Sequence, residues 1–149
     1  MKESLGRRFW SAALTGIPFG VFKVAAGWYA SAFVDPVFGF IVIAWGSLDV
    51  LLNIVSLLLP NSVSYCFLSN IGRRIDVHAG RENWEQTLLA VDTLLTLVIV
   101  AGMIWFRQLS LLPPFLGRLW DLAVVCNVIG VGAGRLWWAL QLRGASPKE

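Results

Sequence analysis

The sequence contains little of what soluble enzymes and metalloproteins use. Only 14% of its 149 residues are charged, against about 25% in soluble domains. Its single histidine, His78, excludes a bis-histidine haem site within one chain. Its two cysteines, Cys66 and Cys126, have no CxxC or zinc-finger spacing. With so few histidines and cysteines, we expect no metal site. The net charge of +3 is small and forms no basic patch, so we expect no nucleic-acid partner.

Residues that would indicate a catalytic centre are also missing. Ser62 and Ser64 lie in a polar stretch without a GxSxG context or a nearby histidine. The run Gly130-x-Gly132-x-Gly134 lies inside an apolar segment, where no phosphate-binding loop could form. We therefore expect no enzymatic activity and no cofactor, although a bound lipid or pigment stays compatible with the composition.

Long hydrophobic segments dominate the chain instead. Hydrophobic residues make up 57% of it, and its mean hydropathy is +0.70. A helix needs about 20 apolar residues to cross a bilayer, and four segments qualify, namely 10–33, 37–59, 87–106 and 119–140. The sequence therefore predicts an all-α fold with a single domain over 1–149, a polytopic membrane protein built as a bundle of four transmembrane helices.

The connections predict two helical hairpins and an orientation. Asp35-Pro36 forms a tight turn in the first hairpin, and 107–118, with Pro113-Pro114, closes the second. The longer loop 60–86 separates them, and its part 64–71 could lie flat on the interface. Lys and Arg accumulate in cytoplasmic segments; with the N-terminus inside, eight lie inside and only Arg107 and Arg118 outside. We expect both termini in the cytoplasm, most simply at a bacterial inner membrane.

Four polar residues within the predicted spans are candidates for a site: Lys23, Asp49, Asn53 and Asp92. A charge at the bilayer centre costs about 2.5–3.5 kcal/mol on insertion scales, so each should face protein or water. Lys23 and Asp49 lie at depths that differ by roughly 4 Å, and Asp92 is a second possible partner for Lys23. Either a structural ion pair locks the first hairpin, or Asp49 or Asp92 binds an ion or a proton, or these groups contact a partner chain or lipid.

Small residues accompany the polar ones at helical spacing. Glycine stripes are the surfaces on which membrane helices pack closely. The expected packing glycines are Gly16, Gly20, Gly27, Gly46, Gly130 and Gly134. Three arginines of the predicted cytoplasmic loop, Arg73, Arg74 and Arg81, serve as topology signals and are candidates for contact with lipid headgroups or a partner.

Three short motifs resemble a known family. The runs Lys23-Val-Ala-Ala-Gly27, Gly46-Ser-Leu-Asp49 and His78-Ala-Gly-Arg-Glu82 resemble, in order and topology, the N-terminal four-helix half of the cation diffusion facilitators, which are zinc, manganese and iron efflux proteins, although the gap from Lys23 to Asp49 is about one helical turn longer than is usual in the family. The resemblance implies four helices with the N-terminus inside, and it implies that Asp49 occupies the position of the second aspartate of a DxxxD transport motif.

The departures from the family pattern affect the metal site. The first aspartate of the DxxxD pair is replaced by Trp45, and neither the family's HxxxD motif nor its cytoplasmic metal-binding domain has a counterpart. A tetrahedral metal site needs about four ligands, whereas the resemblance leaves one carboxylate. We expect a truncated relative with a degenerate metal site, in which His78 is a loop residue at the membrane surface.

Two functions follow from these expectations. The first is a non-catalytic accessory or scaffold subunit of a larger membrane complex of the respiratory or photosynthetic kind, surrounded by lipids and other integral membrane subunits. The alternative is a small homodimeric cation or proton-coupled transporter or channel that uses Asp49 and Asp92. A direct contact between Lys23 and Asp49 in a buried interface would favour the first, and carboxylates converging on water would favour the second.

Overall fold

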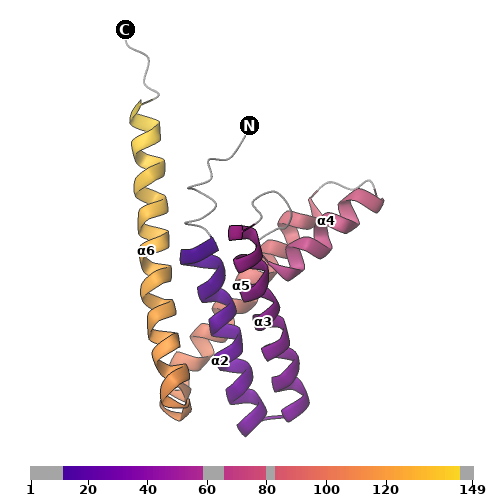
Figure 1. The fold of residues 1–149 in the computed structure, drawn as a ribbon, viewed down its shortest axis with the longest axis vertical. Helices are drawn as coiled ribbons and strands as arrows, with labels where there is room; N and C mark the ends of the chain where they lie inside the picture. Colours follow the sequence, from indigo (N-terminus) through magenta and orange to yellow (C-terminus); the bar gives the residue numbers. More distant parts are fainter. Residues whose placement is uncertain (1–11, 59–65, 80–82, 145–149) are drawn as a thin grey trace.

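The computed structural model describes residues 12–58, 66–79 and 83–144 (Figure 1). The predicted all-helical class is confirmed for these ranges. A short π-helix, η1 (Ala12–Gly16), leads directly into α2, and a short 3₁₀ helix, η2 (Gln108–Leu111), precedes α6. The α-helices are α2 (Ile17–Phe33), α3 (Pro36–Leu58), α4 (Phe67–Ala79), α5 (Trp84–Trp105) and α6 (Pro114–Gly144).

Three stretches of helix are long and apolar enough to cross a membrane: Pro36–Leu58, Trp84–Trp105 and Pro114–Gly132. Their outward faces carry large apolar side chains, such as Phe40, Leu97 and Val128, that the chain leaves more than half exposed. Water would penalise such a surface, whereas hydrocarbon would solvate it. These helices indicate a membrane protein.

The turn between α2 and α3 forms because Asp35 and Pro36 suit the start of a helix. The Asp35 carboxylate accepts a hydrogen bond of 2.7 Å from the Phe38 backbone N–H, which is a typical N-cap contact. Pro36 is the first residue of α3, a position where its missing N–H costs nothing. The first predicted hairpin therefore has its turn where the sequence placed it.

Glycines let α2 and α3 approach at backbone distance. A Cβ added at Gly20 would lie 2.8 Å from the Gly46 carbonyl oxygen, and one added at Gly46 would lie 2.7 Å from the Gly20 carbonyl oxygen. A Cβ at Gly27 would lie 2.9 Å from the Gly39 carbonyl oxygen. Gly16 faces the Asn53 side chain at the other end of the pair. No larger residue fits here without separating the helices.

The second predicted hairpin needs correction. α6 packs mainly on α2 and η1, and it makes few contacts with α5. Figure 1 shows α5 and α6 meeting near η2 and separating toward the other end. On α6, Gly130 packs against Leu14 of η1, with a built Cβ 2.7 Å from the Leu14 Cβ. The two helices are adjacent in sequence but pack little on each other, because α6 makes its contacts with α2 and η1 instead.

Several predicted boundaries also differ. α5 begins at Trp84 instead of residue 87, and α6 begins at Pro114 instead of residue 119. Pro114 can start a helix, so Arg118 lies inside α6 and does not mark its beginning. The predicted loop 60–86 contains a complete helix, α4, which extends well beyond the expected interfacial part 64–71.

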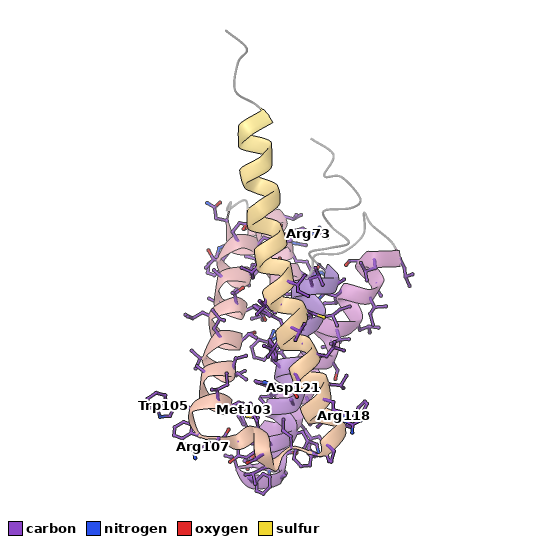
Figure 2. All side chains as sticks on the ribbon, turned by 90° about the vertical axis from the view of Figure 1, so that its left-hand side faces the viewer. Arg73, Met103, Trp105, Arg107, Arg118 and Asp121 are labelled. Carbon is purple, nitrogen blue, oxygen red and sulfur yellow. The ribbon has the colours of Figure 1, made fainter. Side chains whose placement is uncertain are left out.

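The helix ends and connecting segments lie at two opposite ends of the molecule. The start of η1, the helix α4 and the end of α6 lie at one end, and the α2–α3 turn and η2 lie at the other (Figure 1). Arg107 and Arg118 lie toward the end that carries η2, away from Arg73 (Figure 2). Near that end an apolar cluster joins α2, α5 and α6, and the rings of Phe22 and Trp120 lie 4.8 Å apart in it.

Candidate functional site

A buried ion cluster, which we call the Lys23 triad, joins three helices. The Lys23 ammonium of α2 donates a hydrogen bond of 2.5 Å to Asp49 Oδ2 of α3. It donates a second one of 2.7 Å to Asp92 Oδ1 of α5. Lys23 is 0% exposed, and each aspartate is 2% exposed. Both partners that the sequence offered for Lys23 therefore contact it at the same time.

The hairpin makes room for the lysine. A Cβ at Gly46 would lie 2.7 Å from the Lys23 Cβ, so the glycine lets the lysine stem pass between α2 and α3. The ammonium also lies 4.2 Å from the centre of the Trp45 ring, a cation–π contact that stabilises a desolvated cation. Trp45 of α3 thus covers the buried ammonium with a ring face.

Asp49 has a second partner besides Lys23. Its Oδ1 atom accepts a hydrogen bond of 2.7 Å from the backbone N–H of Phe67, the first residue of α4. The N-terminus of a helix carries a partial positive charge that favours an anion. Asp49 therefore fixes the start of α4 as well as the lysine, and it is the residue through which four helices meet.

The polar residues one turn away hydrogen-bond to their own helices. The Asn53 amide donates to the Asp49 carbonyl at 2.8 Å, and the Thr96 hydroxyl donates to the Asp92 carbonyl at 2.8 Å. Both residues are 0% exposed. The sequence placed Asn53 in the site, and the structure puts it beside the triad and against Gly16.

A metal ion would have to compete with the lysine. Among the described residues, Asp49, Cys66 and Asp92 form a buried group whose ligand atoms lie within 4.8 Å of one another. Two carboxylates and a thiol could reach one ion. However, the Lys23 ammonium already binds both carboxylates, so the chain fills this position with a cation of its own.

Cys66 is the residue of this site that sequence reasoning did not find. It immediately precedes α4, is 6% exposed, and accepts a hydrogen bond from the Ser69 N–H through its sulfur. Burial, opposed in part by that hydrogen bond, raises the pKa of the Cys66 thiol to about 12. The thiol is therefore neutral at physiological pH. The one sequence signal that could have indicated Cys66 is its position immediately before the start of a helix.

We expect Cys66 to resist alkylation in the folded protein. Thiolate is the reactive form, and a pKa of about 12 leaves too little of it for reaction at pH 8, so labelling by N-ethylmaleimide should be roughly 10³-fold slower than for a free cysteine. Mass spectrometry of the labelled peptides measures this, with the detergent-unfolded chain as control. Equal rates in both states would contradict the burial of the thiol.

The same residue predicts a pH dependence. The folded protein keeps the Cys66 proton up to about pH 12, whereas thiols of an unfolded chain titrate near pH 8.5. The unfolded state therefore loses this proton first as the pH rises, and the free energy of unfolding should fall between these two values. A Cys66→Ser variant should lose this part of the alkaline slope in unfolding titrations. An unchanged slope would contradict the assignment.

Asp76, another residue that the sequence did not indicate, caps the start of α5. The Asp76 carboxylate of α4 accepts hydrogen bonds from the backbone N–H groups of Trp84 at 2.9 Å and Glu85 at 3.0 Å. Asn83, which precedes α5, makes no side-chain cap and has φ of 102°. Gly72 brings α4 against this end of α5, with a built Cβ 2.7 Å from the Glu85 Cα. The cap comes from another helix, so no local motif marks it.

Replacing Asp76 by alanine should destabilise the protein by about 1–2 kcal/mol, because two N–H groups at the start of α5 lose their acceptor. Equilibrium unfolding in mixed micelles measures the change. Val77→Ala is the matched control, since that side chain is 77% exposed on the same helix and its replacement should change stability by less than about 0.5 kcal/mol. Equal effects would contradict the capping role.

The remaining predicted residues stay apart from the triad. Arg73 and Arg74 are exposed on α4, and Arg81 lies outside the described residues. His78 is on α4 rather than in a loop; its Nδ1 atom hydrogen-bonds the Arg74 carbonyl at 2.8 Å, and it is exposed. Gly134 belongs to α6, but its surroundings are outside the described part of the chain.

Comparison with protein-family models, with curated proteins and with solved structures gave no match.

Proposed function

We propose that the chain is a non-catalytic accessory or scaffold subunit of a larger membrane complex of the respiratory or photosynthetic kind. One observation carries the proposal: the Lys23 ammonium, 0% exposed, contacts two buried aspartates directly. A transported ion would need free carboxylates that it can reach, whereas here a lysine of the chain occupies both. Such an ion cluster suits a structural role, in which it holds α2, α3 and α5 together.

The membrane topology we propose has four spans with both termini in the cytoplasm. Helical backbone runs unbroken from Ala12 to Phe33, which at 1.5 Å per residue is about 33 Å, enough to cross the hydrocarbon. The start of η1, α4 and the end of α6 lie at one end of the molecule (Figure 1). The positive-inside rule supports cytoplasmic termini for this arrangement. We place the chain in a bacterial inner membrane, and we propose from its three short motifs that the bundle descends from a cation diffusion facilitator half.

Two glycines support a docking role for the outer faces. A Cβ added at Gly102 of α5 or at Gly132 of α6 would meet nothing within 4 Å. Both helices carry exposed large apolar side chains around them, including Val98 and Val131. Small residues on an outer face of a membrane helix allow another helix to approach closely, so α5 and α6 are the helices through which we expect a partner subunit to bind.

The test is purification of the tagged chain from its native membrane in a gentle detergent, with identification of co-purifying proteins. We expect stoichiometric integral membrane subunits. Gly132→Leu should reduce their recovery, because the side chain would occupy the docking face, whereas Val77→Leu on α4, which is exposed away from this face, should not. Recovery of the chain alone, or only as a homodimer, would overturn the proposal.

One observation favours a second candidate, a small homodimeric cation or proton-coupled transporter. The ligand atoms of Asp49, Cys66 and Asp92 lie within 4.8 Å of one another, which is the grouping an ion pathway would need once Lys23 moved away. Flux of protons or divalent cations into liposomes tests it. The transporter candidate predicts flux that Asp49→Asn and Asp92→Asn abolish, and the scaffold proposal predicts none above the lipid background.

A further inference from the structure

The charges of the Lys23 triad do not balance. One ammonium faces two carboxylates, and none of the three side chains is more than 3% exposed. With both aspartates ionised, the cluster would keep one uncompensated negative charge in a site shielded from water. An isolated charge is among the costliest groups to bury, and such sites usually bind a counter-ion or a proton instead.

Among the residues that the structure describes, no second cation faces the cluster. The charged residues that act on Asp92 are Lys23 and Asp49. From α3 the cluster also meets the Trp45 ring, and from the segment before α4 it meets Cys66, whose thiol is neutral. Thr96 of α5 directs its hydroxyl to a backbone carbonyl. The described neighbours of the cluster therefore leave its second negative charge uncompensated, and a bound proton would neutralise it.

We propose that the Lys23 triad is a proton-binding site that holds one exchangeable proton, carried by the Asp92 carboxyl group. The proposal rests on neither proposed function, because it concerns the charge state of a buried cluster and not transport. A proton needs no more room than the hydrogen-bonded cluster already has, whereas a metal ion would have to displace the lysine.

The hydrogen bonds decide which aspartate carries the proton. Both oxygens of Asp49 accept hydrogen bonds, one from the Lys23 ammonium and one from the Phe67 N–H at the start of α4. Two such donors and the helix N-terminus hold Asp49 in its ionised form. Asp92 accepts a hydrogen bond from Lys23 and a weaker interaction from the Trp45 side chain, but among the described residues no helix N-terminus faces it, so protonation costs less there.

The proton also determines how α5 is held against the first hairpin. With Asp92 neutral, Lys23 and Asp49 form a balanced pair, and α5 contributes a neutral hydrogen-bonding group. When hydroxide removes the proton at alkaline pH, Asp92 becomes a second anion on one ammonium. The contact of α5 with α2 and α3 should then weaken, so the cluster couples proton release to the packing of α5.

Infrared spectroscopy of the purified full-length chain at neutral pH tests the proposal. Exposed carboxyl groups are ionised at this pH, so a protonated buried carboxyl group gives an isolated C=O band that shifts in D₂O. We expect this band in the wild type, its loss in Asp92→Asn and its retention in Asp121→Asn. Absence of the band in the wild type would overturn the proposal, and its persistence in Asp92→Asn would overturn the assignment to Asp92.

Two further variants keep the test decisive if Asp92→Asn does not fold. Asp49→Asn leaves one ammonium and one carboxylate, so Asp92 should ionise and the band should disappear. Lys23→Met leaves two carboxyl groups without a cation, so the band should grow to about twice its area. A band that is unchanged in both variants would show that the proton does not belong to the triad.

Discussion

Lys23→Met should destabilise the folded protein by about 3–5 kcal/mol, the usual cost of removing one partner from a buried ion pair. The lysine is 0% exposed and holds carboxylates from α3 and α5. Without it, Asp49 has no counter-ion in a buried site and must take up a proton that it does not hold in the native state. The free energy of unfolding in mixed micelles, compared with the wild type, measures the loss.

A rescue experiment separates the charge from the packing. The triple variant Lys23→Met, Asp49→Asn, Asp92→Asn removes all three charges while keeping the side-chain volumes similar. Buried ion clusters replaced in full by neutral groups often lose little stability, so we expect the triple variant to be more stable than Lys23→Met alone. A triple variant as unstable as the sum of the single changes would show that the residues do not interact.

Gly39→Ala should have the second largest effect. A Cβ at Gly39 of α3 would collide with the Ser31 backbone N and Cα atoms of α2, and a backbone cannot rotate away as a side chain can. Overpacking a close contact costs about 1–3 kcal/mol, and we expect the upper part of this range because α2 and α3 must separate. The lysine and Asp49 lie on these same helices, so the triad should loosen as well.

Gly102→Ala is the matched control for this substitution. It is also a glycine inside a membrane helix, but a Cβ there meets nothing within 4 Å. The change should be neutral or stabilising by up to about 1 kcal/mol, the difference in helix propensity between the two residues. Equal losses in the two variants would contradict the close approach of α2 and α3.

The first hairpin could be predicted because its signals are local or periodic. Asp35-Pro36 marks the turn in the sequence itself, Gly20 and Gly27 lie on the Lys23 face of α2, and Gly46 lies on the Asp49 face of α3. Counting residues along three predicted spans indicates Asp49 and Asp92 as partners of Lys23. These inferences need only the periodicity and rise of an α-helix.

The missed features depend on contacts between distant parts of the chain. Asp76 caps α5 from another helix, and Cys66 joins the triad because Asp49 holds the start of α4. The divergence of α5 from α6 follows from which faces pack on α2. No spacing within one segment encodes such contacts, so the hairpin that adjacent helices usually form was the wrong expectation for α5 and α6.

The central feature of the molecule is one ammonium group, that of Lys23, which lies between two carboxylates. Solid-state NMR on bilayer-embedded protein, with ¹⁵N-labelled lysine side chains and ¹³C-labelled aspartate carboxyl groups, measures this contact directly. The sequence has only Lys2, Lys23 and Lys148 and five aspartates, so the signals can be assigned with single variants. We predict one lysine nitrogen coupled to two aspartate carboxyl carbons, with one coupling lost in Asp49→Asn, the other lost in Asp92→Asn, and both kept in Asp121→Asn. A Lys23 nitrogen without coupling to either carboxyl carbon would contradict the Lys23 triad, on which the proposed scaffold function rests.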